Sequence, residues 1–401
     1  MGRTRRKRLR RYTSIADDAD VIDLLRWLRF KSRNLRIRCF PGSGRGVQST
    51  KSIQAGEEII SLPLNLLITP KVENDVTICL DQDRVPGHLI LTVFLMYENH
   101  LGDDSKYRHY LKLLPSEFTT LFFCAANELN TLPDFMRKEI VKQIQQVNYY
   151  YNVIRNFYYS KPCPHCGLHL NYVFKYNLFT WAWFCVNTRS VYYEDDGDIS
   201  LALAPFLDMF NHSVDARTEM VINSKEELYT IKTLKKVKKC EQVFVSYGAH
   251  SNWDLLKEYG FILENNPHDF IIFTFEEVLT LLRNRSKCDN LSRLKFRFIK
   301  ENDLDINLKK YKDEFSWNLN ALLFVLATKD EDLSTMSAKS YSNEFNQNEK
   351  DEIKGLAEIL MESKRNELTS TLKEMESISH CSNGFSFAKE LIKMYINFLT
   401  S

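Results

Sequence analysis

Long apolar runs, internal repeats and low-complexity tracts do not stand out anywhere in this chain of 401 residues. No apolar run approaches the ~20 residues that a membrane-spanning helix needs. The first residues are basic rather than apolar, so we expect no secretory signal. The nine cysteines are an odd number spread from Cys39 to Cys381, which does not suggest a disulfide framework. These absences favour a reducing compartment, and we expect the nucleus, the cytoplasm or both.

Acidic residues are also absent from the start of the chain, where seven basic residues follow one another with no acidic residue between them. These are Arg3, Arg5, Arg6, Lys7, Arg8, Arg10 and Arg11. Subtracting the seven from the 54 basic residues leaves 47 against 52 acidic ones, so the rest of the chain is mildly acidic. The run is typical of a nuclear-import signal, of a phosphate-binding arm or of a solvated terminus, and we predict a basic disordered arm over residues 1–19. A mildly acidic body argues against a dedicated nucleic-acid binder and suits a basic peptide substrate.

The hydrophobic pattern changes character along the chain. Between residues 35 and 70, short apolar runs alternate with turn signals such as Gln54-Ala55-Gly56-Glu57, which predicts a β-meander. Residues 86–183 have a helical pattern, strands return from Ala202 to Val245, and the chain after about Pro267 is mostly helical. The length allows two packed domains. We therefore predict an α+β protein with a strand region, a helical insert, a second strand region and a helical C-terminal domain.

The first string that could carry chemistry is Gly44-Arg45-Gly46-Val47, in a turn between two predicted strands. Glycines in such a turn let the backbone approach a ligand closely. A dinucleotide-binding fold would place its glycines between a strand and a helix, with a third glycine further on. Here a second β-turn follows instead, which excludes that fold. Taken alone, the string is also compatible with an ordinary turn.

Two further strings lie in and after the second strand region. Leu207-Asp208-Met209-Phe210-Asn211-His212-Ser213 places an asparagine and a histidine side by side in an apolar setting, as either ligand-binding groups or a capped turn with a core histidine. Val245-Ser246-Tyr247-Gly248 and then Tyr259-Gly260-Phe261 place two tyrosines twelve residues apart, each before a glycine. The tyrosines could line a narrow aromatic channel, or each could be a core residue before a turn.

Together, in this order, the strings resemble the motifs of SET-domain methyltransferases. GRGV resembles the first cofactor loop, DMFNHS the asparagine-histidine motif and VSYG the catalytic tyrosine motif. Asn187-Thr188-Arg189-Ser190 resembles a further cofactor-binding motif. The helical insert and helical tail resemble the branch of Rubisco large-subunit methyltransferases. The resemblance begins at about residue 20, is strong over residues 35–262 and is weaker in the tail.

The resemblance implies an α+β fold: a β-rich, pseudoknotted SET domain over residues 20–265 with a helical insert at about 85–180, then an all-α substrate-binding domain over 266–401. It implies an enzyme that uses S-adenosyl-L-methionine to methylate a protein lysine. Tyr247 is the implied catalytic residue, with Tyr259 and Phe261 shaping the lysine channel. The implied cofactor-binding residues are Ser43, Gly44, Arg45, Arg189, Asp208, Asn211 and His212.

A possible metal site lies in the insert, where Cys163-Pro164-His165-Cys166-Gly167 has the spacing of half a four-ligand site, with His169 nearby. No second CxxC follows it. Many SET enzymes carry a cysteine-rich segment after the YGF-like string, whereas residues 262–287 here contain no cysteine, as fits the Rubisco-methyltransferase branch. Cys163 and Cys166 are therefore either ligands of a metal completed by an unidentified residue, or part of an exposed loop.

Two other functions stay open at this stage. The acceptor could be a histidine instead of a lysine, since a related branch methylates histidine and the channel residues decide the acceptor. The chain could also be a catalytically silent module that recruits a partner through its tail, although Arg189, Asn211, His212 and Tyr247 together argue against this. We expect the partner to be a histone or another nuclear or cytosolic protein, with no membrane partner and nucleic acid only through chromatin. The substrate lysine, the number of methyl groups and the oligomeric state do not follow from the sequence.

Overall fold

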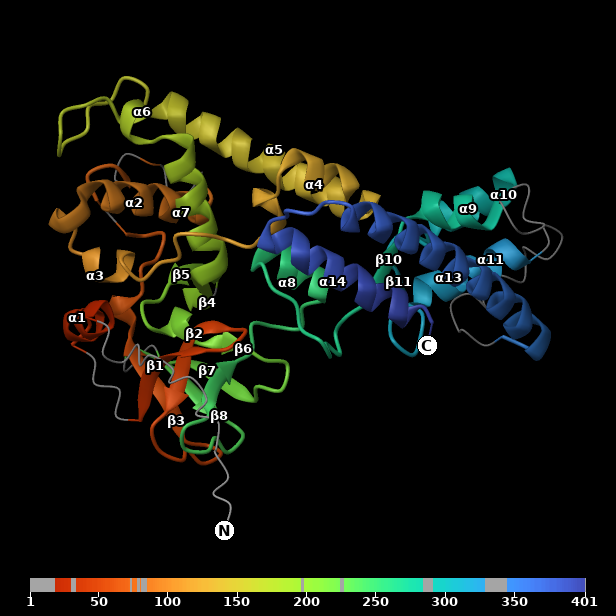
Figure 1. Ribbon diagram of the computed structural model, residues 1–401, viewed down its shortest axis with the longest axis horizontal. Helices are drawn as coiled ribbons and strands as arrows, with labels where there is room; N and C mark the ends of the chain where they lie inside the picture. The colour runs from red at the N-terminus through yellow and green to blue at the C-terminus, as the bar shows by residue number, and fades with distance from the viewer. Residues whose placement is uncertain are drawn as a thin grey trace, which may run out of the picture. The chain divides into compact units, whose positions relative to one another are not determined.

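The protein is described by a computed structural model in which residues gather into two compact units (Figure 1). The first unit comprises residues up to 118 together with 143–249, and the second comprises 119–142 and 250–401. The residues that the structure describes are 19–29, 34–72, 74–77, 80, 85–195, 198–223, 227–283, 291–328 and 345–400. The predicted basic arm, apart from Ala19, lies outside them. The two units divide the chain after residue 249, whereas the sequence places a domain boundary after residue 265, and that boundary stays a prediction.

A four-stranded sheet of the first unit carries most of the strings singled out above (Figure 1). Its order is β1 (Leu35–Phe40), β2 (Gly44–Ser49), β9 (Gln242–Val245) and β6 (Asn211–His212). β1 and β2 form an antiparallel hairpin, β2 and β9 pair antiparallel, and β9 and β6 pair parallel. Leu35 and Ile37 of β1 are buried, as expected for a strand with one face on the core, whereas Cys39 near its end is exposed. The sheet thus brings segments from both ends of the first unit's sequence together.

Two smaller sheets complete the strand regions of this unit. Antiparallel strands in the order β3 (Glu58–Pro63), β8 (Leu228–Thr233) and β7 (Thr218–Asn223) form one of them. A hairpin of β4 (Ser190–Asp195) and β5 (Asp198–Leu203) forms the other. Both strand regions of the sequence therefore contribute to one sheet through β3 and β8, as they do through β2 and β9.

Helices fill the stretch between the two strand regions, where the sequence predicts an insert. The most apolar of them is α2, which is buried without interruption from Leu89 to Glu98 and packs against α7. An uninterrupted apolar surface is typical of a helix covered on all sides. The helices from the N-terminus to the end of the insert are α1 (Ala19–Trp27), α2 (Gly87–Leu101), α3 (Arg108–Leu111), α4 (Ala126–Thr131), α5 (Asp134–Phe157), α6 (Leu170–Val173) and α7 (Tyr176–Arg189).

The second unit is helical, as predicted for the C-terminal region, with one addition. Its long helix α13 buries Ile353 and Leu360, which lie seven residues apart and therefore on one face of the helix. Two short antiparallel strands interrupt the helices. The sequence alone does not predict them, because a three-residue apolar run such as Ile271–Phe273 is too short to show the pattern of a strand. Besides α4 and the first part of α5, which lie within residues 119–142, the elements of this unit are α8 (Asn252–Glu258), β10 (Ile271–Phe273), α9 (Phe275–Arg283), α10 (Arg293–Glu301), β11 (Leu308–Lys310), α11 (Trp317–Ala327), α13 (Gln347–Glu376) and α14 (Asn383–Phe398).

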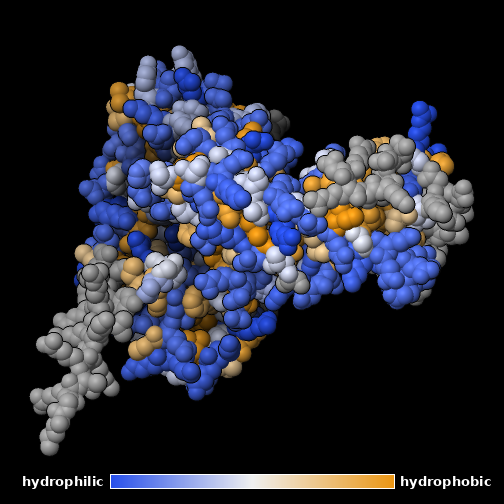
Figure 2. Space-filling model, turned by 45° about the vertical axis from the view of Figure 1, so that its right-hand side comes forward, coloured by the Kyte–Doolittle hydropathy of each residue, from blue (hydrophilic) through white to orange (hydrophobic). Residues whose placement is uncertain are grey.

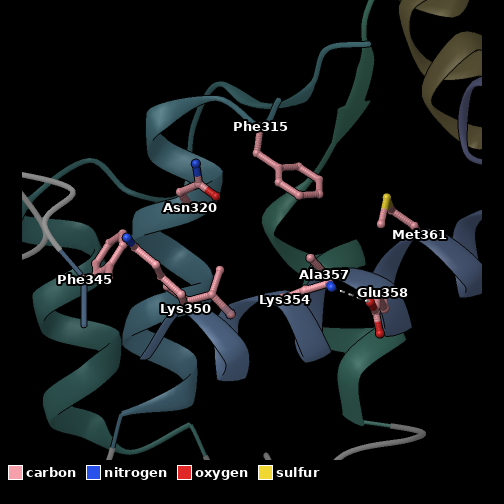
Figure 3. Close-up of a pocket in the computed structure, with 9 residues that line it drawn as sticks. Phe315, Asn320, Phe345, Lys350, Lys354, Ala357, Glu358 and Met361 are labelled. Carbon is pink, nitrogen blue, oxygen red and sulfur yellow. Dashed lines mark ion pairs between the residues drawn. The ribbon is translucent and has the colours of Figure 1, made fainter. Parts of the chain in front are cut away.

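A cavity of about 400 Å³ lies within the second unit, where α13 and the segment before α11 meet. Figure 3 shows Phe315, Ala357 and Met361 among its lining residues, with Lys354 and Glu358 as an ion pair of 3.9 Å on α13. On the face seen in Figure 2, hydrophobic side chains also gather on the surface of this unit. All residues that line the cavity belong to the second unit, and none of them is among the predicted site residues. Within the described residues, no helix is both long and apolar enough to cross a bilayer.

Candidate active site

Two glycines at the start of β2 serve different purposes. Gly44 has a φ of +67°, a left-handed conformation that glycine adopts without strain. Gly46 has an ordinary φ but no free space, because a Cβ built on it would lie 2.6 Å from Gln242 Nε2 and 2.7 Å from Asn211 Nδ2. The second glycine of the GRGV string is therefore required by the two amide side chains packed against it.

The amide of Asn211 fixes the turn that leads into β2. Its Nδ2 donates to the carbonyl oxygens of Arg45, at 3.1 Å, and Ser43, at 3.3 Å. The Ser43 hydroxyl donates to Gln242 Oε1 at 3.4 Å. On the other side of the turn, the guanidinium of Arg45 donates to the carbonyl oxygen of Leu113 at 2.8 Å. The first and second strings of the sequence are therefore joined directly by hydrogen bonds.

Tyr247 lies two residues after the end of β9 and is held at three points. Its backbone N–H donates to His212 Nδ1 at 3.0 Å, and its hydroxyl donates to the carbonyl oxygen of Phe210 at 2.7 Å. Its ring stacks on that of His212, with centroids 5.1 Å apart and planes at 26°. Because His212 Nδ1 accepts, it carries no proton. Phe210 and His212 thus orient both the ring and the hydroxyl of Tyr247.

Asp208 is a buried carboxylate that side chains from the helical insert contact. Tyr110 on α3 donates its hydroxyl to Asp208 Oδ2 at 3.1 Å. Arg189, at the end of α7, donates from Nη1 to the backbone oxygen of Asp208 at 2.9 Å. Burial raises the pKa of Asp208 to about 6, although the charge of Arg189 and the hydrogen bond from Tyr110 oppose this shift. Asp208, one of the implied cofactor-binding residues, is thus held by residues of α3 and α7.

Several buried polar atoms at this site have no hydrogen-bond partner within the part of the chain that the structure describes. They are Arg189 Nε, Asp208 Oδ1 and Gln242 Nε2. A buried polar group left unsatisfied costs about 1–3 kcal/mol. A polar ligand with matching donors and acceptors would offset that cost. These two donors and one acceptor therefore suit a small polar cofactor.

Tyr259 and Phe261 belong to the second unit. Tyr259 ends α8, and its ring centroid lies 6.2 Å from that of Phe261 and 6.0 Å from that of His250. Gly260 between them has a φ of +81°, and a Cβ there would lie 2.7 Å from the backbone of Thr119. The two aromatic rings are therefore held on a tight turn. Their membership of one channel with Tyr247 stays a prediction.

Cys163 is buried and Cys166 is exposed, and both are free thiols in the loop after α5. A third side chain that can bind a metal lies beside them, and it is His100 of α2. His169, the neighbour noted in the sequence, instead pairs through its backbone with Pro162. A candidate third ligand thus comes from α2, far from the cysteines in the sequence, while the alternative of an exposed loop without a metal stays open here.

Comparison with known protein families matches residues 44–248 to the SET domain. The chain belongs to the SET-domain family. It resembles SET domain-containing protein 4 of Homo sapiens, with 31% identity over 352 residues that cover 82% of this chain and 79% of that protein. The protein of the same name from Artemia parthenogenetica is 28% identical over 379 residues, covering 91% of this chain and 92% of its own length.

Solved structures support the fold of this SET-domain protein. The crystal structure of the SET domain of LSMT bound to lysine and AdoHcy matches with a TM-score of 0.63 at 17% identity, over 96% of this chain and 90% of the other. A structure of Rubisco LSMT bound to AdoMet gives a TM-score of 0.61 at 18% identity, over 95% and 90%. The predicted SET fold with a helical C-terminal region, and its likeness to the Rubisco-methyltransferase branch, are confirmed.

Three residues of the site were missed by reasoning on the SET motifs alone. Tyr110 bonds to Asp208 from 98 residues away in the sequence, and Leu113 contributes only a backbone oxygen. Gln242 begins β9, where it is one polar residue before an apolar run. None of these has a local pattern that would mark it. Only the contacts made by the folded SET domain identify them.

The stability of this SET domain should depend on pH through Asp208. Its pKa rises from 3.8 to about 6 on folding, so its contribution to the free energy of unfolding is present below about pH 4 and lost as the pH rises through about 6. Asparagine does not titrate. Relative to the unchanged protein, Asp208→Asn should therefore gain up to roughly 3 kcal/mol between about pH 4 and pH 7. Urea unfolding of both proteins across this range measures the difference, and a difference independent of pH would contradict the shift.

Proposed function

We propose that this protein is an S-adenosyl-L-methionine-dependent protein-lysine N-methyltransferase. One arrangement carries the proposal: Asn211 closes the turn before β2, and the adjacent His212 holds Tyr247 with its hydroxyl on the Phe210 carbonyl. A fixed backbone turn and an oriented aromatic hydroxyl lie on neighbouring strands. Transfer of a group between two bound molecules depends mainly on such alignment.

The residues at the β2 turn fit the cofactor of this reaction. When bound, S-adenosyl-L-methionine supplies an activated methyl group on a sulfonium sulfur. The backbone of Ser43, Gly44 and Arg45, with the side chains of Arg189, Asn211 and His212, would hold it, and Asp208 would brace the turn. The unsatisfied atoms of Arg189 and Asp208 support this assignment. LSMT structures of the same fold contain AdoMet or AdoHcy.

Tyr247 is the residue to which we assign catalysis. A lysine reacts only as the neutral amine, although its pKa in water is about 10.4. An apolar, aromatic channel disfavours the ammonium form, and we assign Tyr259 and Phe261 to that channel. The Tyr247 hydroxyl, already oriented by its donation to Phe210, orients the amine nitrogen for in-line attack. The aromatic rings also tolerate the methylated cation that results.

The acceptor is lysine in this proposal, and histidine is the second candidate. Support for lysine comes from the LSMT structure bound to lysine and from Ribosomal lysine N-methyltransferase set11 of Schizosaccharomyces pombe, 28% identical over 252 residues. Support for histidine comes from the actin-histidine N-methyltransferase of Danio rerio, 29% identical over 262 residues but over only 43% of that protein's length. The lysine relative matches over 61% of its length, so we favour lysine.

We also propose that the substrate is a basic protein, a histone or another nuclear or cytosolic protein. The support is electrostatic, since the chain without its seven N-terminal basic residues carries a small excess of acidic residues. The same assignment places the protein in the nucleus and the cytoplasm. It would act on chromatin only through a protein substrate.

Methyl transfer to a panel of proteins tests the proposal. The purified protein is incubated with S-adenosyl-L-methionine labelled in its methyl group, together with core histones and fractionated cell extract. Mass spectrometry of the labelled peptides should locate the methyl group on a lysine side chain. Label on histidine would overturn the acceptor and keep the transferase. Absence of label, together with absence of cofactor binding in calorimetry, would contradict the proposed enzymatic function.

A further inference from the structure

The loop after α5 and the C-terminal end of α2 bring three ligand-type side chains together, away from the residues assigned to methyl transfer. His100 lies in the last turn of α2, and Cys163 and Cys166 lie in the loop. Their candidate ligand atoms, one imidazole nitrogen and two sulfurs, all lie within 4.8 Å of one another. We propose that these three residues bind a zinc ion that fixes the insert.

The three candidate ligand atoms would have to move slightly closer together to coordinate zinc. With Zn–S of about 2.3 Å, Zn–N of about 2.0 Å and tetrahedral angles, the ligand atoms of a filled site lie roughly 3.5–3.8 Å apart. The three atoms are therefore no more than about 1.3 Å too far apart in any pair. Thiolate and imidazole ligands together are the set that zinc takes in structural sites.

The state of His100 is a second, independent observation. Its Nε2 is buried and has no hydrogen-bond partner within the described part of the chain. A buried ring nitrogen without a partner is costly, whereas coordination to a metal uses its lone pair. His100 also lies in the last turn of a 15-residue helix, where the backbone carbonyls favour a nearby positive charge.

The loop has the backbone of a ligand-holding turn. Gly167 N–H donates to the Cys163 carbonyl at 2.8 Å, and Cys163 N–H donates to the Leu168 carbonyl at 2.6 Å. Gly167 adopts a φ of +75°, which suits glycine, and Pro162 pairs with His169 to close the base of the loop. These bonds hold both cysteines in one short turn before any metal binds.

His165 is the fourth ligand in this proposal. It lies between the two cysteines, and its ring meets that of His100 edge-on, with centroids 5.8 Å apart and planes at 87°. Its Nε2 makes a long contact of 3.8 Å with Asp104 Oδ2. The side chain is about one-third exposed, so it has room to turn toward the metal. The ion would then tie α2 to the loop and stabilise the insert by linking segments far apart in the sequence.

Metal analysis of the full chain, purified without added chelator, tests the zinc site. We expect about one zinc ion per chain in the unchanged protein and less than about one-tenth of that in Cys163→Ser and His100→Ala. Cys240→Ser is the matched control, since Cys240 is an exposed free cysteine outside the cluster, and it should retain the metal. Equal zinc in all four proteins would contradict the assignment.

A second measurement uses only the unchanged protein, so it does not depend on how the variants fold. After zinc is exchanged for cobalt(II), the absorption spectrum should show the bands of a tetrahedral ion and sulfur-to-cobalt charge transfer. Uptake of neither metal, or recovery of Cys163 and Cys166 as a disulfide from protein kept reduced, would overturn the site. His165→Ala should lose zinc to a competing chelator sooner than the unchanged protein, and equal retention would remove His165 from the ligand set.

Discussion

Replacing Tyr247 by phenylalanine is expected to lower kcat/KM for methyl transfer by at least about 100-fold, a size typical of losing one group that orients or stabilises the reacting atoms. The change removes only the hydroxyl, whose hydrogen bond to the Phe210 carbonyl fixes its direction. The ring can still stack on His212, and the backbone N–H can still donate to His212 Nδ1. Cofactor affinity should therefore stay within about twofold, which calorimetry can measure.

Tyr229→Phe is the control for this experiment. Tyr229 is a buried tyrosine of β8 whose hydroxyl donates to Met220 Sδ at 3.1 Å, so the variant also loses a part-buried hydroxyl contact. It should retain kcat/KM. If Tyr247→Phe kept full activity while still binding cofactor, the catalytic assignment of Tyr247 would be wrong. If both variants lost activity equally, the loss would reflect stability rather than catalysis.

The second large effect is expected from Gly46→Ala, through binding of the cofactor. The added Cβ would lie 2.6–2.7 Å from the amide nitrogens of Gln242 and Asn211, which must then move. Asn211 would lose its hydrogen bonds to the Ser43 and Arg45 carbonyls, and the turn proposed to hold the cofactor would lose its support. Two such bonds, at roughly 1 kcal/mol each, predict a dissociation constant at least about tenfold weaker.

Gly56→Ala provides the comparison, because it separates backbone strain from loss of the site. Gly56 has a φ of +86° and open space around its Cβ position, so alanine there should cost about 1 kcal/mol in the free energy of unfolding. Its cofactor affinity should be unchanged. Calorimetric titration with S-adenosyl-L-methionine measures both variants, and normal affinity in Gly46→Ala would show that the Asn211 amide does not support the site.

The sequence predicts the main elements because their signals are local. The helical insert and the strands around Asn211 and before Tyr247 follow from short patterns that the structure places where they were expected. The placement of Gly44-Arg45-Gly46-Val47 in a turn was wrong: these residues begin β2 and pair with β1, and the turn lies just before them. The resemblance to the family motifs further indicates which of these short strings belong to one site. Hydrogen bonds between Asn211 and Arg45, and between His212 and Tyr247, join the three strings in the structure.

Contacts that depend on packing between distant segments could not be predicted. Tyr110 reaches Asp208, and His100 reaches Cys163, from helices whose own pattern explains only their buried faces. The strands β10 and β11 support each other through pairing and are too short to show a period. The role of Gly46 also escaped, because a steric limit is set by the neighbours of a residue and not by its flanking sequence.

The strand order of the four-stranded sheet has a consequence for how the chain acquires its shape. β9 is the last of the four strands to be synthesised, yet it lies between β2 and β6, pairing Val47 with Val243 and His212 with Val245. Such a sheet has high contact order, so it closes late and slowly. Until residue 245 leaves the ribosome, β2 and β6 expose unpaired edges that invite aggregation. A nascent or truncated chain that stops before β9 would lack both the central strand of this sheet and Tyr247.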